Sequence, residues 1–400
     1  MDLEAFLCKQ CVNVAGHRRD EFLGKVSYFQ GQYDKEEDFA RLNKRLLDLE
    51  GRSAQGDRLF FLSVPPTVFG LVCENVHRQA RSVAGFTRLI IEKPFGRDSR
   101  TFGELNDTTS RLFREDQLYR IDHYLAKEKV LNLVAFRFAN QLFEPLWNRN
   151  HIAQVEIIFK ENIGTDGRGG YFDGFGIIRD IMQNHLLQVL LWLAMEPPEK
   201  LSAGCIAAEK TKLLSAIGTL RLQDCFLGQY TSNAASGGSD PGYLDDPTVP
   251  AGSRCPTFAA VVLRVDNERW RGVPFLMRAG KGLDERLAEV RITFKKQTYN
   301  GLLPGDPNEL VLRIQPEEGI YLKCINKRPG WSQDQIAPVH LNMNYKHTFP
   351  GSYVAGAYER MLLNAARGEQ SLFVGSQELV EAWRIFTPLL DEIDASAPQP

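Results

Sequence analysis

Apolar residues follow two different patterns along this chain, and the pattern changes near residue 150. In the first part, short continuous apolar segments alternate with segments in which apolar residues recur at helical spacing. We predict strands at residues 25–33, 58–65, 87–94 and 117–122, separated by helices at residues 36–50, 66–81 and 100–113. Continuous apolar strands joined by crossover helices predict a parallel sheet that is covered on both faces.

The second part carries strands with short polar connections, which is the pattern of an antiparallel sheet. Strands are predicted at residues 151–160, 257–266, 273–281, 288–296, 309–316 and 319–326. Helices are predicted at about 176–195, 207–217, 352–367 and 375–391, and residues 231–242 have the composition of a surface loop. The predicted fold class is therefore α/β plus α+β. A parallel-sheet domain at residues 1–124 precedes a domain at residues 125–400 with a large antiparallel sheet and helices.

Composition excludes several classes of partner. Of the 400 residues, 43% are hydrophobic and 24% are charged, as is usual for a globular protein. A formal net charge of -2 gives no electrostatic reason to expect nucleic acid or an anionic membrane as a partner. No apolar run is long enough to span a membrane, and the N-terminus lacks the pattern of a secretory signal. Seven scattered cysteines fit a reducing compartment, so we predict a cytoplasmic protein.

Cys8 and Cys11 form a CxxC pair. A zinc site would need a second pair of ligands, and none follows at a suitable spacing. We therefore interpret the two thiols as neighbours on an ordinary helix, and we predict no metal site.

Ionisable residues are concentrated where two of the predicted parallel strands end. They are Glu92 and Lys93 after one strand, and Asp122, His123, Tyr124 and Lys127 after another. In open α/β sheets, ligands bind beyond the carboxyl ends of the strands. A helix predicted to begin within residues 126–136 would direct its N-terminal amides toward the same place, which favours an anion. The segment indicates either a phosphate site or a salt-bridged strand end with a core histidine.

A second group of ionisable residues lies in the segment RDIMQNHLLQVL. Asp180 and His185 stand at the start of a helix that is apolar on nearly all sides further along. A lone histidine in such a helix is more often a hydrogen-bonded core residue than a catalyst. A carboxylate partner would reverse that interpretation, because it fixes the tautomer and stabilises the protonated imidazole that a general base forms. Asp122 is a candidate for that partner.

Six segments of the chain resemble glucose-6-phosphate dehydrogenase: RIDHYLAKE, IIEKPFGRD, GGYFDGFGIIRDIMQNHLLQ, GYLDDPTVP, NERWRGVPF and EAWRIFTPLL. The matches extend from about Gln32 to about Leu390, and several are long and rich in uncommon residues. The resemblance implies oxidation of glucose 6-phosphate to 6-phosphoglucono-1,5-lactone with hydride transfer to NADP, the first step of the pentose phosphate pathway. It also implies a homodimer, or a homotetramer built from dimers, formed through the large sheet.

The family's functional positions match this sequence residue by residue. By that resemblance, His185 is the general base that takes the C1 hydroxyl proton, and Asp122 is its partner. His123, Tyr124 and Lys127 would hold the sugar phosphate. Further contacts with the sugar would come from Glu161, Asp180, Lys281 and Arg286. Lys93 would lie between sugar and coenzyme, and Pro94 follows it in a context that suits a cis peptide bond.

Part of the family also has a second, structural NADP site. Its positions match Arg278, Arg291, Arg313, Gln315, Tyr321 and Lys323, which the sequence alone would describe only as a basic sheet edge. Three positions depart from the family pattern. Ala126 replaces a glycine and would be strained if its φ angle were positive. Phe69 replaces a tyrosine near the coenzyme, and Leu287 replaces a lysine of the structural NADP site.

The largest departure is the glycine-rich turn of a dinucleotide-binding domain. No G-x-G-x-x-G follows a predicted strand, and no P-loop is found. We therefore expect an incomplete Rossmann-like domain that begins after the first βα unit, and a C-terminus that stops before the tail completing the structural NADP site. The catalytic coenzyme site would then bind NADP weakly, and the N-terminal third would be prone to aggregation.

Three hypotheses about function follow. The first is an active NADP-dependent glucose-6-phosphate dehydrogenase. The second is a catalytically impaired or non-catalytic chain of the same family, which keeps the sugar-phosphate site and the dimer interface but transfers no hydride. The third is another two-domain sugar dehydrogenase that shares the EKP strand end, and the RIDHY and RDIMQNH segments disfavour it.

Overall fold

The computed structural model describes residues 17–51, 56–233, 240–296, 305–331, 335–344, 348–396, 398 and 400. The chain divides into two compact units, the first comprising residues up to Arg58 with Thr67–Thr87, the second comprising Leu59–Pro66 and the residues from Arg88 onward. The predicted domain boundary between residues 124 and 125 stays a prediction. The CxxC pair lies outside the described residues, as does part of the predicted loop at 231–242.

Helices dominate the first part of the chain. They are α2 (His17–Gly24), α3 (Glu36–Glu50), η1 (Pro66–Val68), α4 (Phe69–Asn75) and the π-helical η2 (Val76–Ala80). The helices predicted at 36–50 and 66–81 are confirmed, whereas the strand predicted at 25–33 is wrong. The amides of Lys25 and Val26 bond back into the end of α2, and the Gln32 amide donates to a side-chain carboxylate. Turns therefore use backbone groups that a strand would need for its ladder.

A small sheet places the first ionisable segments. Its strands are β1 (Arg58–Leu62), β2 (Thr87–Ile91) and β3 (Leu118–Arg120), in the order β1-β2-β3. β2 and β3 run parallel, with Ile91 opposite Arg120. Helix α5 (Ser99–Leu112) connects them, and Asp98 caps its N-terminus, because the Asp98 carboxylate accepts a hydrogen bond from the Thr101 amide. The predicted parallel sheet is confirmed, with three strands in the described part of the chain instead of four.

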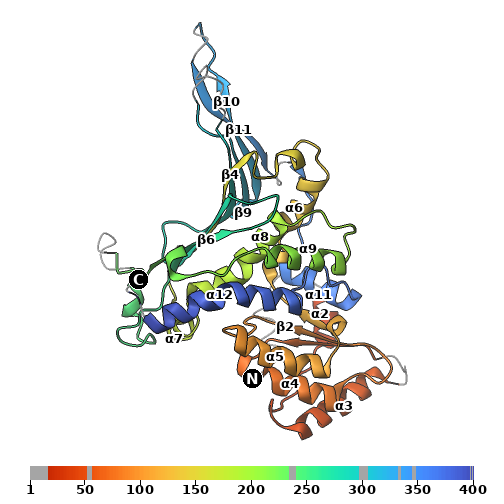
Figure 1. Cartoon of the computed structure of the whole chain (residues 1–400). Helices are drawn as coiled ribbons and strands as arrows, with labels where there is room; N and C mark the ends of the chain where they lie inside the picture. Colours follow the sequence, from red (N-terminus) through yellow and green to blue (C-terminus); the bar gives the residue numbers. More distant parts are fainter. Residues whose placement is uncertain are drawn as a thin grey trace. The chain divides into compact units, whose positions relative to one another are not determined.

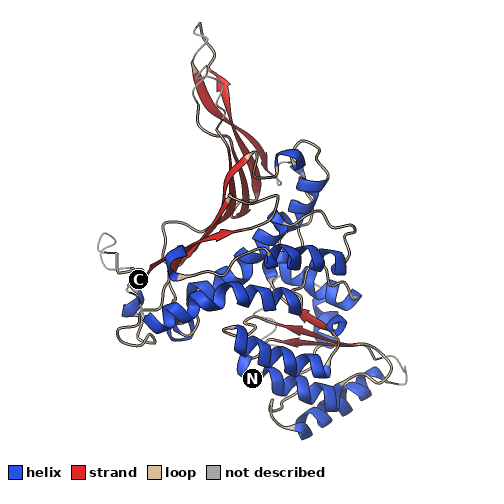
Figure 2. Ribbon diagram, in the orientation of Figure 1, coloured by secondary structure: helices blue, strands red, loops and turns tan. Residues whose placement is uncertain are grey.

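The second sheet of the structure is larger and has eight strands. It is drawn in Figures 1 and 2. Its order is β11-β10-β9-β8-β4-β7-β6-β5. The strands are β4 (Ile152–Lys160), β5 (Cys225–Gly228), β6 (Phe258–Arg264), β7 (Pro274–Gly280), β8 (Leu287–Phe294), β9 (Glu309–Gln315), β10 (Gly319–Lys327) and β11 (Ile336–Asn344). All neighbours are antiparallel except β4 and β7, which run parallel. The large antiparallel sheet is confirmed with that exception.

The sequence pattern missed β5 and β11, the two edge strands. β5 has only four residues. β11 contains Pro338 and many exposed residues, and a proline within an otherwise strand-like run argues against a strand unless it lies at an edge. Edge strands have one partner and therefore need less of the apolar alternation that the prediction relies on.

Helices cover the large sheet and hold the second ionisable group (Figure 2). The longer ones are α6 (Glu128–Phe138), the π-helical η6 (Ile178–Leu186), α8 (Leu187–Ala194), α9 (Ala203–Ser215), α11 (Ala357–Arg367) and α12 (Ser376–Ser396). The shorter helical segments are α7 (Gly169–Asp173) and the 3-10 helices η3 (Glu115–Gln117), η4 (His123–Ala126), η5 (Glu144–Leu146), η7 (Leu222–Asp224) and η9 (Tyr243–Asp245). α6 packs against β9, and η6 packs against β4 and β7.

Buried tryptophans fix the end of the α8 helix. The indole N–H of Trp147 donates to Leu193 O at 2.8 Å, and that of Trp270 donates to Ala194 O at 2.8 Å. Both rings are fully buried, so they satisfy carbonyls at the helix end that would otherwise lack a partner. Within the described ranges, no helix has the length and apolar character needed to cross a membrane.

Candidate active site

Two neighbouring strand ends build one side of the site. Lys93 follows β2 and Asp122 follows β3, and because these strands are parallel, both residues lie beyond the same edge of the small sheet. The Lys93–Pro94 peptide bond is cis. Asp122 also begins the η4 turn, since its Oδ1 accepts a hydrogen bond from the Tyr124 amide at 3.0 Å. The RIDHY segment is therefore a strand end and a capped turn.

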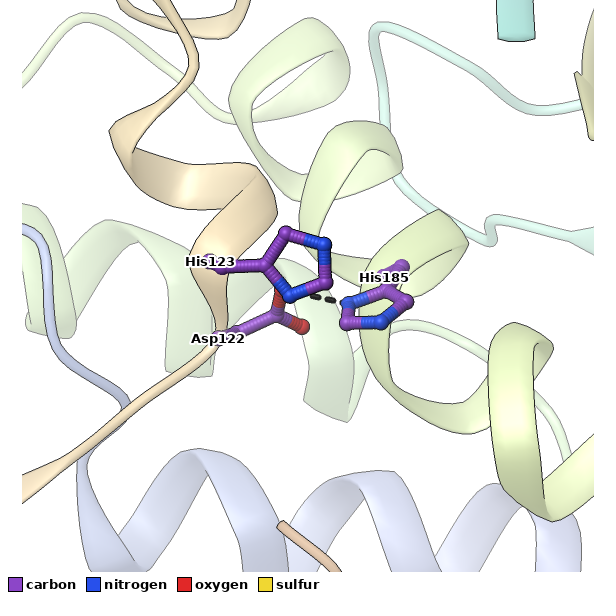
Figure 3. Close-up of side chains that lie close together, drawn as sticks. All are labelled: Asp122, His123 and His185. Carbon is purple, nitrogen blue, oxygen red and sulfur yellow. Dashed lines mark hydrogen bonds and ion pairs between the residues drawn. The ribbon is translucent and has the colours of Figure 1, made fainter. Parts of the chain in front are cut away.

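Asp122 and His185 form a buried pair, as Figure 3 shows. Asp122 Oδ1 lies 2.6 Å from His185 Nδ1, and each residue is only 2% exposed. The second carboxylate oxygen, Oδ2, is buried and has no hydrogen-bond partner among the described residues. His185 comes from η6, which the sequence predicted as a helix, and the pairing with Asp122 that we predicted is present.

The two groups shift each other's protonation. Burial alone would raise the pKa of Asp122, but His185, His123 and the Tyr124 amide together outweigh burial and hold that pKa below its usual value. Burial lowers the pKa of His185, and the Asp122 carboxylate offsets only part of this effect. Near neutral pH, the carboxylate is therefore ionised and the imidazole is neutral, with Nδ1–H directed at Asp122. This leaves Nε2 as the ring atom that can accept a proton.

Aromatic rings enclose the pair. The His123 ring lies edge-on to the His185 ring at a centroid distance of 4.5 Å, and the Tyr124 ring stacks on His185 at 4.6 Å. Tyr358, from α11, stacks on His123 at 6.0 Å and hydrogen-bonds Glu92. Burial and the neighbouring His185 lower the pKa of His123 to about 3, so this ring is neutral as well. Sequence reasoning missed Tyr358, and no local signal marks a tyrosine so distant in the chain.

Two lysines share one acidic group beside the pair. Lys93 Nζ donates to the backbone oxygen of Asp180 at 2.7 Å and to its Oδ1 at 3.0 Å. Lys281 Nζ lies 2.6 Å from Glu161 Oε2 and 3.6 Å from Asp180 Oδ2. Burial would raise the pKa of Asp180, but Lys93 and Lys281 together lower it. The four residues form a compact network of opposite charges.

Lys127 stands on the other side of Tyr124. Its Nζ lies 3.8 Å from the centre of the Tyr124 ring and donates to Gln315 Oε1 at 2.5 Å. Burial, followed by the charge of Arg286, lowers the pKa of Lys127 to about 8. Arg286 is exposed and acts here through its charge. Gln315, which was predicted for the structural NADP site, thus contacts Lys127, which was predicted for the sugar phosphate, and both roles stay predictions.

The structure therefore gathers most of the predicted catalytic and sugar-binding residues. These are Lys93, Asp122, His123, Tyr124, Lys127, Glu161, Asp180, His185 and Lys281, with Arg286 near Lys127 and Tyr124. Their roles in catalysis and binding stay predictions. Ala126 is buried in η4 and is not among the residues with positive φ, so the condition under which we predicted strain is not met. An alanine fits because the turn follows ordinary right-handed geometry.

The predicted structural NADP residues lie on one face of the large sheet. Strand registers place Arg278, Arg291, Arg313, Tyr321 and Lys323 on that face, together with Glu156 and Glu289. Arg278 pairs with Glu156, while Arg291 and Arg313 both pair with the buried Glu289. Guanidinium groups and an aromatic ring suit phosphate and base recognition, so the residue types fit a nucleotide. Leu287 is buried in β8, and Phe69 is buried in α4.

A metal ion is the alternative occupant of the buried pair. Asp122, His123 and His185 offer ligand atoms within 4.8 Å of one another. The positive charge of Lys93 acts on both imidazoles, however, and it opposes a cation as much as it opposes their protonation. Since Asp122 already binds His185 Nδ1, the arrangement fits an acid–base pair better than a metal centre.

Two family models together match almost the whole chain. "Glucose-6-phosphate dehydrogenase, NAD binding domain" matches residues 4–132, and "Glucose-6-phosphate dehydrogenase, C-terminal domain" matches residues 134–400. With the Rossmann-like sheet and the Asp122–His185 pair, these matches place the chain in the class of two-domain dehydrogenases with a nicotinamide coenzyme.

Similar proteins narrow the class further. The chloroplastic glucose-6-phosphate 1-dehydrogenase 1 of Arabidopsis thaliana is 49% identical over 386 residues, which cover 95% of this chain and 66% of the relative. The Dictyostelium discoideum glucose-6-phosphate 1-dehydrogenase is 47% identical over 390 residues, which cover 96% of this chain and 78% of the relative. A solved glucose-6-phosphate dehydrogenase in complex with its substrate glucose 6-phosphate matches with a TM-score of 0.92 and 42% identity, over 100% of this chain and 82% of that chain. The chain belongs to the glucose-6-phosphate dehydrogenase family, as the resemblance predicted.

Proposed function

We propose that the protein oxidises glucose 6-phosphate at C1 to 6-phosphoglucono-1,5-lactone with hydride transfer to NADP, the first step of the pentose phosphate pathway. The observation that carries this proposal is the buried Asp122–His185 pair, whose Oδ1 and Nδ1 atoms are 2.6 Å apart. Three lysines lie near this pair, namely Lys93, Lys127 and Lys281. A neutral imidazole held by a carboxylate is a general base, and a group of ammonium ions suits a phosphorylated sugar. The solved relative that holds glucose 6-phosphate supports the choice of substrate.

The proposed reaction uses His185 as the base. His185 Nε2 takes the proton of the C1 hydroxyl while hydride leaves C1, so that the C1–O bond gains double-bond character and the lactone forms. Asp122 stabilises the imidazolium and keeps Nδ1 protonated. Lys127 and His123 hold the phosphate, and Glu161, Asp180 and Lys281 orient the sugar hydroxyls. Orientation of this kind lowers the entropic cost of reaching the transition state.

The chemistry that bound NADP would supply is a hydride acceptor, its nicotinamide ring. Lys93 is the residue of this chain that we assign to the boundary between sugar and coenzyme. Lys93 follows strand β2, and Asp180 accepts hydrogen bonds from its ammonium group, so the ammonium has a defined position. The choice of NADP over NAD belongs to this proposal, because the family model names only a NAD binding domain.

A turnover assay tests the proposal. Purified protein would be mixed with glucose 6-phosphate and NADP, and NADPH would be followed by its absorbance. We expect turnover with glucose 6-phosphate and much less with glucose, and a higher kcat/KM with NADP than with NAD. No NADPH formation by a correctly folded protein would overturn the proposal. It would favour the second hypothesis, a chain that binds sugar phosphate without oxidising it.

Binding of glucose 6-phosphate by calorimetry separates these two outcomes. If the protein is inactive but calorimetry shows that it binds glucose 6-phosphate, the chain is the non-catalytic member of the family described in the second hypothesis. If the protein neither binds nor oxidises glucose 6-phosphate, our assignment of the sugar-phosphate site is wrong.

We also propose a homodimer, or a homotetramer, formed through the large sheet. β11 is an edge strand with exposed Leu341 and Met343, and an apolar edge is a surface at which chains associate. Light scattering after gel filtration tests this, and Leu341→Lys should shift the protein toward the monomer. A monomeric wild-type protein at micromolar concentration would contradict it. A cytoplasmic location also stays a proposal, to be tested by cell fractionation, since the Arabidopsis relative is chloroplastic.

A further inference from the structure

A buried polar network that the proposed mechanism does not use lies behind the catalytic helix. It consists of Gln188 on α8, Lys210 on α9 and Glu378 on α12, and all three side chains are buried. Burying an ammonium and a carboxylate costs free energy that apolar residues would not require. The presence of such a group in an otherwise apolar helix packing therefore calls for a specific role.

Gln188 is the centre of this network. Its Oε1 accepts a hydrogen bond from Lys210 Nζ at 3.0 Å, and its Nε2 donates to Glu378 Oε2 at 3.4 Å. Lys210 Nζ also donates to Glu378 Oε2 at 3.4 Å and lies 5.1 Å from the Trp192 ring centre. Because an amide has one accepting and one donating end, these contacts fix the orientation of the Gln188 amide and hold the α8 helix against α9 and α12.

The same helix carries His185. η6 and α8 follow each other without a break from residue 178 to residue 194, and Gln188 stands three residues after His185. A rotation of the helix that broke the Gln188 hydrogen bonds would therefore also move the imidazole away from Asp122.

Asp122 is tied to the network from the other side. The amide of Val374, just before α12, donates to Arg120 O on β3 at 3.0 Å, two residues before Asp122. The Phe373 ring packs edge-on against Tyr119 of β3 at 4.9 Å. The start of α12, which carries Glu378, is thus attached to the strand that ends at Asp122.

We propose that Gln188, Lys210 and Glu378 are positioning residues that set the relative placement of Asp122 and His185. The network joins the helix of the base to the strand of its carboxylate through α12, and α9 supplies the charge that orients the Gln188 amide. This inference rests on the proposed function, because it concerns the same base. None of the three residues is among those that we assign to substrate binding.

The first test replaces the whole network by apolar residues. The variant Gln188→Leu/Lys210→Met/Glu378→Leu leaves no buried charge unpaired, and such replacements are often neutral or stabilising. We expect a Tm close to that of the wild type, a KM for glucose 6-phosphate within about threefold, and a kcat lowered about 10- to 100-fold, as expected for a misplaced catalytic group. An unchanged kcat in this variant would overturn the proposal.

A matched control separates positioning from general helix packing. Arg384 on α12 donates to the carbonyls of Leu214 and Ile217 at the end of α9 and pairs with Glu381. It joins the same two helices without contacting Gln188. The variant Glu381→Gln/Arg384→Met should therefore lose stability and keep the wild-type kcat. A fall in kcat equal to that of the network variant would show that only helix packing matters, and would overturn the inference.

A spectroscopic measurement does not depend on turnover. The Nδ1 proton of His185, shared with Asp122 at 2.6 Å, should give a low-field proton NMR signal. We expect this signal to shift or broaden in Glu378→Gln, which keeps the side-chain shape but removes the carboxylate partner of Lys210, and to stay unchanged in the control. An unchanged signal in Glu378→Gln overturns the inference. A wild-type protein without turnover, in which Glu378→Gln still alters the signal, overturns the proposed function alone.

Discussion

Asp122 and His185 stand 63 positions apart in the chain and meet at 2.6 Å, through one carboxylate oxygen and one ring nitrogen. The carboxylate has a second task, because the same Oδ1 accepts the Tyr124 amide and so fixes the turn that carries His123 and Tyr124. One side chain therefore orients both the base and the segment that we assign to phosphate binding.

Asp122→Asn should lower kcat about 10²- to 10⁴-fold, the range that general base catalysis contributes. The amide cannot stabilise the imidazolium. The sign of the pH effect also follows: Asp122 raises the pKa of His185, so its loss lowers that pKa and moves the acidic limb of the kcat/KM profile to lower pH. Steady-state kinetics between pH 4 and pH 9 would measure both effects. An acidic limb at higher pH in the variant would contradict the pairing.

His185→Asn should abolish turnover while leaving sugar-phosphate binding largely intact. The imidazole acts in the transition state, whereas the lysines bind the ground state as well, so kcat should fall much more than affinity. Rapid kinetics would report kcat, and calorimetry would report the Kd of glucose 6-phosphate. A kcat near that of the wild type would remove His185 from the mechanism.

Lys127→Ala should act mainly on KM. A charge-assisted hydrogen bond contributes about 1.5–3 kcal/mol, so the KM for glucose 6-phosphate should rise roughly 10- to 100-fold. kcat should change little, because this contact is made in the ground state and in the transition state alike. Glucose is the control substrate. If unphosphorylated glucose lost as much kcat/KM as glucose 6-phosphate, Lys127 would not be the phosphate ligand.

The pKa of Lys127 predicts a second effect of pH. With a pKa of about 8 in the free protein, the ammonium is present below pH 8 and is lost as the pH rises through that value. kcat/KM for glucose 6-phosphate should therefore fall above about pH 8, since it reports groups of the free enzyme. Lys127→Arg keeps its charge throughout this range and should remove that limb. An unchanged alkaline limb in Lys127→Arg would assign it to another group.

The spacing of apolar residues predicted most of the helices and strands whose sequences have a clear helical or strand periodicity. The strand before Lys93, the strand before Asp122 and the helix of His185 all have continuous apolar faces, so their sequences were informative. The segment 25–33 has strand-forming residues but finds no ladder, and tertiary context overrides such a weak preference.

The site required more than local pattern. Periodicity placed Asp122 and His185 on separate elements. The residue types made Asp122 a candidate partner of His185, and the resemblance implied the pair. Tyr358 and Gln315 reach the site from α11 and the end of β9, and their contacts with His123 and Lys127 depend on how the chain folds over long separations. Ala126 shows the reverse case, where the family pattern suggested strain on a condition, a positive φ, that the backbone does not meet.

Because η6 is a π-helix, the number of residues between Asp180 and His185 determines whether their side chains lie on the same side of the helix. Asp180 and His185 are five residues apart, and in an α-helix that spacing would place them about 140° apart around the axis. A π-helix bonds each residue to the fifth one along, so the same spacing brings both side chains to one side, where each feels the charge of Lys93. In an α-helix, two residues on one side would instead stand four positions apart, with three residues between them and not four. We therefore expect the segment to tolerate the deletion of one residue between Asp180 and His185 better than the insertion of one.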